Sequence, residues 1–427
     1  MHSYLSYVAG LEALARQALS SRNVPAAEMA VHLDGGPYRA LRTAISLEAL
    51  QSAGAFFTGE GLRAFALSGL QLYANDCTPV YDPACGAGDL LLGAAGQLPV
   101  LSSLEETLDQ WGNRLGGSDI HDEFIRTTRA RLVLAAYARG ARASSGDLRL
   151  ESTFPKIRAA NAFELDALPG SPVVLINPPY GMTAAPEDCE WTNGSVSLAA
   201  LFVDHLLSLA SNGTRIVAIL PDVLRSGARY KKWRASVSSR ATLKRIDVWG
   251  VFDSATDVDV FVLDMQVDTS ANAIADAQWL GLTAYGSTVS DFFEVSIGPV
   301  IPHRHLNRGN WAPYLHSRNA PPWASVTEII TRRRFHGRLI EPPFLVVRRT
   351  SSPHDSERAV ATMVYGSRPV AVENHLIVIK PKGGSVQLCR ALLRHLKEPQ
   401  TTEWLNSRIR CRHLTIGAIS SLPFPRP

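Results

Sequence analysis

Short apolar runs alternate with longer amphipathic stretches through the central part of the chain. Apolar runs such as 173–176 and 214–220 predict buried strands, and residues 198–210 predict a helix. Strands and helices that alternate in this way indicate an α/β fold, with a mainly parallel sheet and helices on both faces. The pattern predicts further strands near 80–81, 117–119, 160–163, 243–248 and 258–265, and further helices from 90 onward, over 126–138 and over 225–234.

The two ends of the chain have different patterns. Residues 2–20 and 42–50 have apolar side chains at helical spacing, so we expect a helical cap over residues 1–45, ahead of the α/β domain over 46–267. Beyond residue 268, Pro and Gly turn signals separate short β-rich runs at 344–348 and 375–379, and a helix is predicted over 386–397. This pattern predicts a separate α+β domain over 268–427.

The composition is that of an ordinary globular protein. The 427 residues are 46% hydrophobic and 19% charged, which is enough to bury the cores of two domains. No apolar stretch reaches the roughly 18 residues of a membrane span, and the first residues lack the basic and apolar pattern of a signal peptide, so we expect neither. The five cysteines form no C-x-x-C pair, so we expect no disulfide framework, no metal site and a reducing cytoplasm.

Charge is distributed unevenly along the chain. Residues 268–427 contain 20 Lys and Arg against 11 Asp and Glu, although the whole chain has a net charge of only +4. Most of these cations are Arg, including Arg332–Arg334, Arg348, Arg349, Arg408, Arg410 and Arg412. Arg suits phosphate neutralisation and the reading of guanine edges, so the excess favours DNA contact over a merely solvated basic surface.

The segment Asn177-Pro178-Pro179-Tyr180 directly follows the strand predicted at 173–176. The two prolines lack N–H donors, so the turn offers carbonyl oxygens without competing amides. The Asn177 side-chain oxygen and the Pro178 carbonyl form a pair of acceptors suited to one –NH2 group. The Tyr180 ring supplies a face on which a planar substrate can stack. The alternative is an ordinary turn at the end of a strand.

A second motif lies about 95 residues upstream, at Asp82-Pro83-Ala84-Cys85-Gly86-Ala87-Gly88. Gly86 and Gly88 allow the close backbone approach that nucleotide-type turns require. The motif is neither a G-x-G-x-x-G fingerprint nor a phosphate-binding loop ending in Lys-Ser or Lys-Thr. Asp82 would repel a phosphate but suits a cationic ligand.

Together these motifs resemble the S-adenosylmethionine-dependent DNA methyltransferases that act on the N6 amine of adenine, in the subgroup where the cofactor motif precedes the catalytic motif and a target-recognition region. The resemblance covers about residues 50–267 and implies a Rossmann-like, class I methyltransferase fold with a seven-stranded sheet. Phe252 resembles the second aromatic residue that contacts the extruded base. The residues that the resemblance assigns to the cofactor are Phe56, Thr58, Asp82, Pro83, Ala84, Cys85, Gly86, Gly88, Asp119, Ile120, Asn161, Ala162 and Asn177.

The implied reaction explains these residue types. The lone pair of an adenine amine is delocalised into the ring, and two acceptors at Asn177 and Pro178 would draw it toward the methyl donor. Because a duplex hides this amine, the base must flip out, and Tyr180 and Phe252 would compensate by stacking. The resemblance therefore implies S-adenosyl-L-methionine and double-stranded DNA as ligands, and a separate restriction or defence protein as a possible partner.

Several alternatives stay open from the sequence. The same four-residue motif serves methyltransferases that act on RNA bases or on glutamine amides, although the basic C-terminal region favours DNA. N4-cytosine is less favoured because that family usually has Ser at the position of Asn177. A non-catalytic DNA-recognition subunit is a third possibility, whereas a fused nuclease lacks a recognisable motif in this chain.

Overall fold

The computed structural model describes residues 2–46, 57–72, 77–144, 148–170, 172–253, 256–271, 276–280, 286–410 and 412–425. The chain divides into two compact units. The first comprises residues 1–224 and 232–274, and the second comprises residues 225–231 and 275–427. Phe56 lies outside the described residues, as do residues 47–50 of the helix predicted over 42–50.

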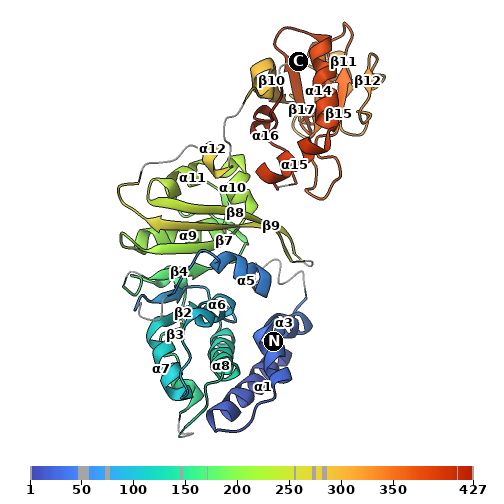
Figure 1. Ribbon diagram of the computed structural model, residues 1–427. Helices are drawn as coiled ribbons and strands as arrows, with labels where there is room; N and C mark the ends of the chain where they lie inside the picture. Colours follow the sequence, from blue (N-terminus) through green and yellow to red (C-terminus); the bar gives the residue numbers. More distant parts are fainter. Residues whose placement is uncertain are drawn as a thin grey trace. The chain divides into compact units, whose positions relative to one another are not determined.

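A seven-stranded sheet forms the centre of the first unit, in the order β3-β2-β1-β4-β7-β9-β8 (Figure 1). The pairs from β3 to β7 are parallel, and β9 runs antiparallel to both of its neighbours. This arrangement is the fold of class I methyltransferases, as predicted. The strands are β1 (Val80–Asp82), β2 (Leu115–Asp119), β3 (Ile157–Ala159), β4 (Val173–Ile176), β7 (Arg215–Pro221), β8 (Ala241–Asp253) and β9 (Thr256–Val267).

Helices cover both faces of this sheet. From β1 the chain proceeds through β2 to β3 in one direction, and from β4 to β7 in the other. Because parallel crossovers are right-handed, the helices of the two halves lie on opposite faces. All four residues of β4 are buried, as expected for a strand covered on both sides. The helices are α5 (Glu60–Leu67), α6 (Asp89–Gln97), α7 (Leu104–Arg114), α8 (Asp122–Ala138), α9 (Leu198–Leu209), α10 (Asp222–Ser226) and α11 (Lys231–Ser238).

The N-terminal helices pack against α8. Helix α1 (His2–Leu19) buries Tyr4, Val8 and Leu11, which follow the predicted helical spacing. It is followed by α2 (Ala26–Leu33) and α3 (Gly36–Ala44), and both α1 and α2 contact α8. These helices therefore share a core with the sheet domain.

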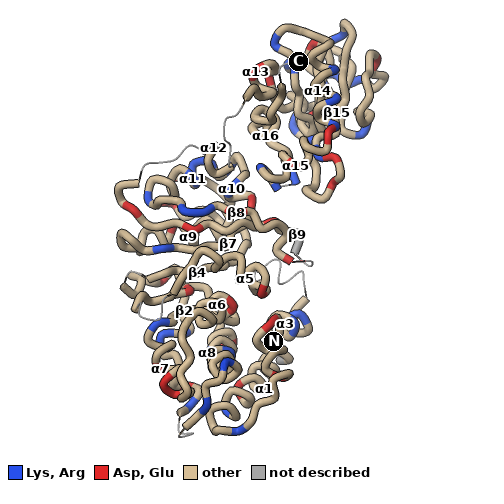
Figure 2. Tube along the Cα trace, viewed as in Figure 1, with Lys and Arg blue, Asp and Glu red and all other residues tan. Residues whose placement is uncertain are grey.

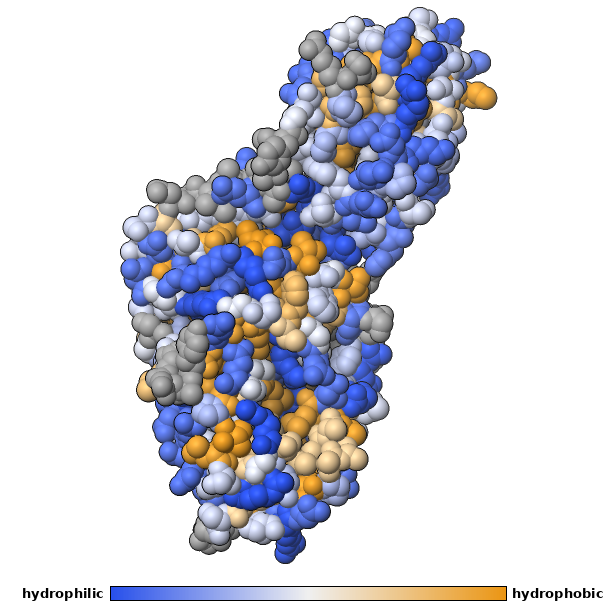
Figure 3. Space-filling view, viewed as in Figure 1, coloured by the Kyte–Doolittle hydropathy of each residue, from blue (hydrophilic) through white to orange (hydrophobic). Residues whose placement is uncertain are grey.

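The second unit is β-rich with a small number of helices, as predicted for the C-terminal region. Its larger sheet has the order β10-β17-β14-β15-β12, and its smaller sheet has the order β13-β11-β16. Helix α14 (Val386–Lys397) packs on the larger sheet and has the predicted bounds. On the visible face, this unit is mostly hydrophilic with scattered apolar residues (Figure 3). The remaining elements are β10 (Phe293–Ile297), β11 (Asn310–Leu315), β12 (Ser325–Val326), β13 (Arg332–Phe335), β14 (Phe344–Arg348), β15 (Ala361–Val364), β16 (Ala371–Val372), β17 (Leu376–Pro381), α12 (Asp276–Trp279), α13 (Val289–Phe292), α15 (Pro399–Arg408) and α16 (Ile416–Ser420).

The structure differs from the predicted elements in at least four places. The helix predicted over 225–234 is interrupted, because α10 ends at Ser226 and α11 begins at Lys231. Strand β3 ends at Ala159, and Asn161 caps a 3-10 turn (Ala162–Glu164) instead of lying at the end of a strand. The segment 181–197, for which the apolar pattern predicts no strand, contains β5 (Met182–Ala184), which pairs with β6 (Ser195–Ser197). Helix α3 ends at Ala44, where Ile45 adopts an extended conformation. No helix in the described part of the chain is long and apolar enough to cross a membrane.

Candidate active site

The two motifs meet at the point where the order of the sheet reverses. Strands β1 and β4 are neighbours, yet the chain leaves them in opposite directions. A crevice forms outside the carboxyl ends of strands at such a point, and ligands of open α/β sheets bind there. The glycine motif follows β1, and Asn177 follows β4.

A pocket of about 290 Å³ lies at this edge. Its wall joins residues that follow β1, β2, β3 and β4, so segments far apart in the sequence line one cavity. The lining residues are Phe57, Pro83, Ala84, Gly86, Asp119, Ile120, His121, Phe124, Ala160, Asn161, Ala162, Asn177, Pro179, Leu198 and Phe202.

Most of the residues predicted for the site are therefore brought together. Thr58, Asp82, Cys85, Gly88, Pro178, Tyr180 and Phe252 lie in neighbouring positions of the chain or the core but are not among the residues that line the pocket. The prediction did not include five lining residues with large side chains, Phe57, His121, Phe124, Leu198 and Phe202. Phe57 is adjacent to the predicted Phe56, whereas Phe124 and Phe202 belong to helices whose apolar periodicity identifies a core face without showing which member reaches a cavity.

The glycine turn needs both of its glycines. Gly86 and Gly88 have φ of 51° and 83°, in the left-handed region that favours glycine. A Cβ on Gly88 would lie 2.6 Å from Cγ2 of Thr128, and a Cβ on Gly86 would lie 3.2 Å from the Phe57 ring. The turn therefore brings bare backbone close to the pocket, as the sequence motif indicates.

Asp119 connects this turn to the end of β2. Its two carboxylate oxygens accept hydrogen bonds from the backbone N–H groups of Gly86 and His121, both at 3.0 Å. Burial raises the pKa of the Asp119 carboxyl, although these two backbone bonds partly offset that effect. The carboxylate thus positions the pocket wall and also forms part of it.

Asp82 is almost completely buried, with 2% of its surface exposed, below the same turn. Its Oδ1 accepts a hydrogen bond from the Ala84 N–H at 3.1 Å. Burial raises the pKa of this carboxyl well above its ordinary value, and the neighbouring Asp119 and Asp89 raise it further. A cation in or near the pocket would relieve this accumulation of negative charge.

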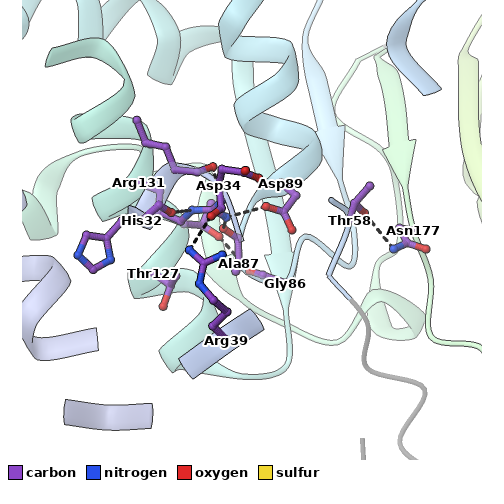
Figure 4. Close-up of polar contacts among 12 residues, drawn as sticks. His32, Asp34, Arg39, Thr58, Gly86, Ala87, Asp89, Thr127, Arg131 and Asn177 are labelled. Carbon is purple, nitrogen blue, oxygen red and sulfur yellow. Dashed lines mark hydrogen bonds and ion pairs between the residues drawn. The ribbon is translucent and has the colours of Figure 1, made fainter. Parts of the chain in front are cut away.

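The Asn177 side chain is held at both ends. Its Nδ2 donates to Oγ1 of the buried Thr58 at 3.0 Å, and its Oδ1 accepts from the Tyr180 hydroxyl at 2.6 Å (Figure 4 shows the Thr58 bond). Burial raises the pKa of the Tyr180 hydroxyl well above its ordinary value, so the group stays a proton donor. The amide is therefore oriented with its oxygen toward Tyr180.

Phe252 lies against Tyr180. Their ring centroids are 5.8 Å apart and the ring planes are nearly perpendicular, at 89°. The two predicted aromatic residues are thus in contact, in an edge-to-face arrangement instead of two parallel faces. In this arrangement a planar group can lie parallel to one of the two rings but not to both.

Arg131 ties the N-terminal helices to the glycine turn. This buried guanidinium donates to the carbonyls of Ala87, His32 and Leu33, and it lies 2.9 Å from the Asp89 carboxylate (Figure 4). Arg131 of α8 therefore joins the backbone of the turn to the C-terminal end of α2.

The lining of the pocket suits a ligand that is apolar in part and not anionic. Among the described residues that line it, Asp119 is an acid and none is Lys or Arg, so the lining disfavours a phosphate. No group of three or more His, Cys, Asp or Glu that could hold a metal ion occurs among the residues that the structure describes.

Comparison with known proteins identifies the fold. No protein-family model matches the sequence, and no curated protein matches it. The structure is similar to the DNA complex of the type IIL restriction–modification enzyme MmeI, with 12% identity and a TM-score of 0.53, over 91% of this chain and 70% of that one. At this identity the likeness establishes the fold alone.

Two further solved structures match less closely. A modification subunit of a putative type I restriction enzyme from Vibrio vulnificus YJ016 matches at 18% identity and a TM-score of 0.38, over 55% of this chain and 49% of that subunit. The type IIG restriction endonuclease BpuSI matches at 15% identity and a TM-score of 0.48, over 92% of this chain and 61% of the endonuclease. The matched regions thus span less than two thirds of either protein.

Proposed function

We propose that this chain is a site-specific DNA methyltransferase that transfers a methyl group from S-adenosyl-L-methionine to the N6 amine of an adenine flipped out of duplex DNA. The observation that carries this proposal is the pocket itself. Gly86 of the cofactor motif and Asn177 of the catalytic motif line one cavity of about 290 Å³, at the switch point of the sheet.

The residues of the pocket fit this cofactor. The apolar walls of Phe57, Phe124 and Phe202 suit an adenine ring, and Asp119 at the end of β2 suits a ribose. The buried Asp82 carboxylate favours the cationic amino group over an anion. When bound, the cofactor supplies an electrophilic methyl group on a sulfonium.

The chain itself positions the amine. The Asn177 side-chain oxygen and the Pro178 carbonyl each accept a hydrogen bond from one N–H group of the amine. These two hydrogen bonds direct the nitrogen lone pair toward the methyl group. The N–C bond forms as the S–C bond breaks, and the displaced sulfur becomes a neutral thioether. The amine then loses one proton to water, and no strong base is needed.

The comparisons support the biological setting, since MmeI and the Vibrio subunit are described as restriction–modification proteins. We infer that this chain acts as the modification component of a restriction–modification or phage-defence system in the cytoplasm, with a separate restriction or defence protein as partner. The basic second unit would supply the DNA-recognition surface.

One experiment tests the proposal. The protein is incubated with radiolabelled S-adenosylmethionine and, in separate reactions, duplex DNA, RNA or protein, and the labelled product is digested and identified. We expect N6-methyladenine in DNA from the wild type and no product from Asn177→Ala, whose cofactor binding should stay near normal. Label in RNA or in glutamine, or no cofactor binding by the wild type, would overturn the proposal.

A further inference from the structure

The segment 301–340 of the second unit is strongly basic. It contains seven Arg and a single acid, Glu328. Figure 2 shows Lys and Arg on several sides of this unit, so charge alone does not identify a binding face. The register of two paired strands and the exposure of their side chains identify that face.

The pairing of β11 with β13 separates their side chains into two faces. Trp311 lies opposite Arg334 and Pro313 opposite Arg332, so these four residues share one face of the ribbon. We call them the ribbon face. The other face consists of Ala312, Tyr314 and Phe335, which are buried in a hydrophobic cluster, together with the half-buried Arg333.

Trp311 distinguishes the ribbon face from an ordinary charged edge. Strand β13 is at the edge of its sheet, and exposed charges on edge strands prevent unwanted pairing. That role does not explain an indole with 54% of its surface exposed. The Arg334 guanidinium lies 5.2 Å from the centre of this ring, so the tryptophan holds the cation in place above the strand.

The loop before β11 is fixed against β13. Asn307 Oδ1 accepts from the Arg334 N–H at 2.8 Å, and Arg333 donates to the His305 carbonyl at 2.6 Å. A Cβ on Gly309 would lie 2.7 Å from the backbone of Phe335, so only glycine permits this approach. This loop carries the exposed Arg304 and Arg308.

The cationic surface continues beyond Arg332. A pocket of about 460 Å³ is lined by Arg332 and Arg368 together with Glu328 and Tyr365. Guanidinium groups bind phosphates by charge-assisted hydrogen bonds, and Glu328 is the one acid of this lining.

From the charge, the register and the exposed tryptophan we infer that the ribbon face binds duplex DNA. A two-stranded β-ribbon fits the major groove, where Arg332 and Arg334 would contact phosphates or guanine edges. The inference rests on the proposed function and extends it by naming the elements of the second unit that hold the target duplex.

The test compares two double variants that remove equal charge. Binding of a fluorescein-labelled 30-base-pair duplex of random sequence is measured by fluorescence anisotropy at several salt concentrations. Arg332→Ala/Arg334→Ala should weaken binding by roughly tenfold or more and reduce the slope of log K against log salt by about 2, because each lost phosphate contact removes about 0.9. The control Arg390→Ala/Arg394→Ala changes two exposed arginines of α14 and should leave the slope near the wild-type value.

A third variant tests the indole separately. Trp311→Ala should weaken binding several-fold while changing the salt slope by less than the double variant does, and Trp311→Phe should restore much of it. Thermal unfolding of the second unit, which contains all of these substitutions, serves as the folding control for every variant.

The outcomes separate the inference from the proposed function. If the wild type methylates and binds DNA while Arg332→Ala/Arg334→Ala behaves like the α14 control, the ribbon face is not the DNA surface and the proposed function stands. If the wild type binds no duplex under any salt condition, both fail.

Discussion

At the scale of single residues, the Tyr180 hydroxyl donates a hydrogen bond to the Asn177 side-chain oxygen, which the proposed reaction needs as an acceptor for the amine. This hydroxyl lies 2.6 Å from Oδ1 of Asn177, and the ring plane of Tyr180 is nearly perpendicular to that of Phe252. An incoming amine would have to displace this hydroxyl, and the ring would then be free to stack on the base. In the proposed reaction, the Tyr180 hydroxyl would therefore take the position of the substrate amine until the substrate binds.

Tyr180→Phe separates the two roles. It keeps the ring but leaves Asn177 Oδ1 available, so we expect methyl transfer at or above the wild-type rate, by at most about tenfold, since a net hydrogen bond contributes about 0.5–1.5 kcal/mol. Tyr180→Ala should lose binding of the extruded base, measured with 2-aminopurine fluorescence. Equal loss in both variants would show that the hydroxyl itself is required.

Thr58 positions the amide from its other end. Thr58→Val removes the acceptor for Asn177 Nδ2 at nearly constant volume, so the amide is freer to turn its oxygen away. We expect a several-fold lower kcat, with cofactor affinity nearly unchanged, from loss of a bond worth about 1 kcal/mol. Thr58→Ser keeps the hydroxyl and should restore kcat, and a matching loss in Thr58→Ser would point to packing instead.

We expect the buried Asp82 carboxylate to lower the free energy of unfolding and to strengthen binding of the cofactor. An acid whose folded-state pKa exceeds its unfolded value of about 4 supports the fold below that pH, and this contribution is lost as the pH rises through the folded-state pKa. Asp82→Asn should therefore be more stable than the wild type at pH 8, with a smaller advantage near pH 4, in urea unfolding. The same variant should bind S-adenosylmethionine more weakly. A stability difference that does not change with pH would contradict this assignment.

At the scale of elements, α8 joins the N-terminal helices to the glycine turn through Arg131. Removal of this buried guanidinium leaves the Asp89 carboxylate and three carbonyls without their donor. We expect Arg131→Met to cost about 3–5 kcal/mol of unfolding free energy, measured by denaturant titration. Arg16→Met breaks an exposed pair with Glu151 and should cost about 0–1 kcal/mol. Similar losses of unfolding free energy in the two variants would show that Arg131 does not join the N-terminal helices to the glycine turn.

Elements with a clear apolar pattern could be predicted from the sequence. Helix α14 and strand β14 have the predicted bounds. The buried residues of α14 follow helical spacing, and β14 begins with an uninterrupted apolar run of four residues, all of them buried. The hairpin of β5 and β6 was not predictable in this way, since all three residues of β5 are exposed and no apolar alternation marks it. Helix α7 does have a readable signal, in which Ser103 caps the helix three residues before Glu106.

The candidate site was predictable only in part, for a physical reason. Residues that directly follow strands, such as Gly86, Asp119 and Asn177, line the pocket because parallel strands end at one edge. Phe124 and Phe202 reach the same pocket from helices, and helical spacing alone does not reveal which apolar residue does so. The bond between Thr58 and Asn177 joins residues 119 positions apart and depends on tertiary structure.

At the scale of the whole molecule, the two units have separate cores. One cluster around the sheet includes Val80 and Leu175, and another in the second unit includes Leu345 and Leu392. Units with independent cores unfold as separate cooperative transitions unless their interface couples them. Only the first unit contains the candidate cofactor pocket.

Calorimetry should therefore resolve two unfolding transitions, and S-adenosylmethionine should raise the midpoint temperature of one of them. At a cofactor concentration 100 times Kd, the stabilisation amounts to about 2.7 kcal/mol. Arg131→Met should lower the midpoint temperature of the transition that the cofactor raises. Leu345→Ala leaves a cavity in the second core, which costs about 2–5 kcal/mol, and should lower the midpoint temperature of the other transition. If the cofactor raises the transition that Leu345→Ala lowers, or if both variants lower a single common transition, the cofactor pocket and the second core do not belong to independent folding units.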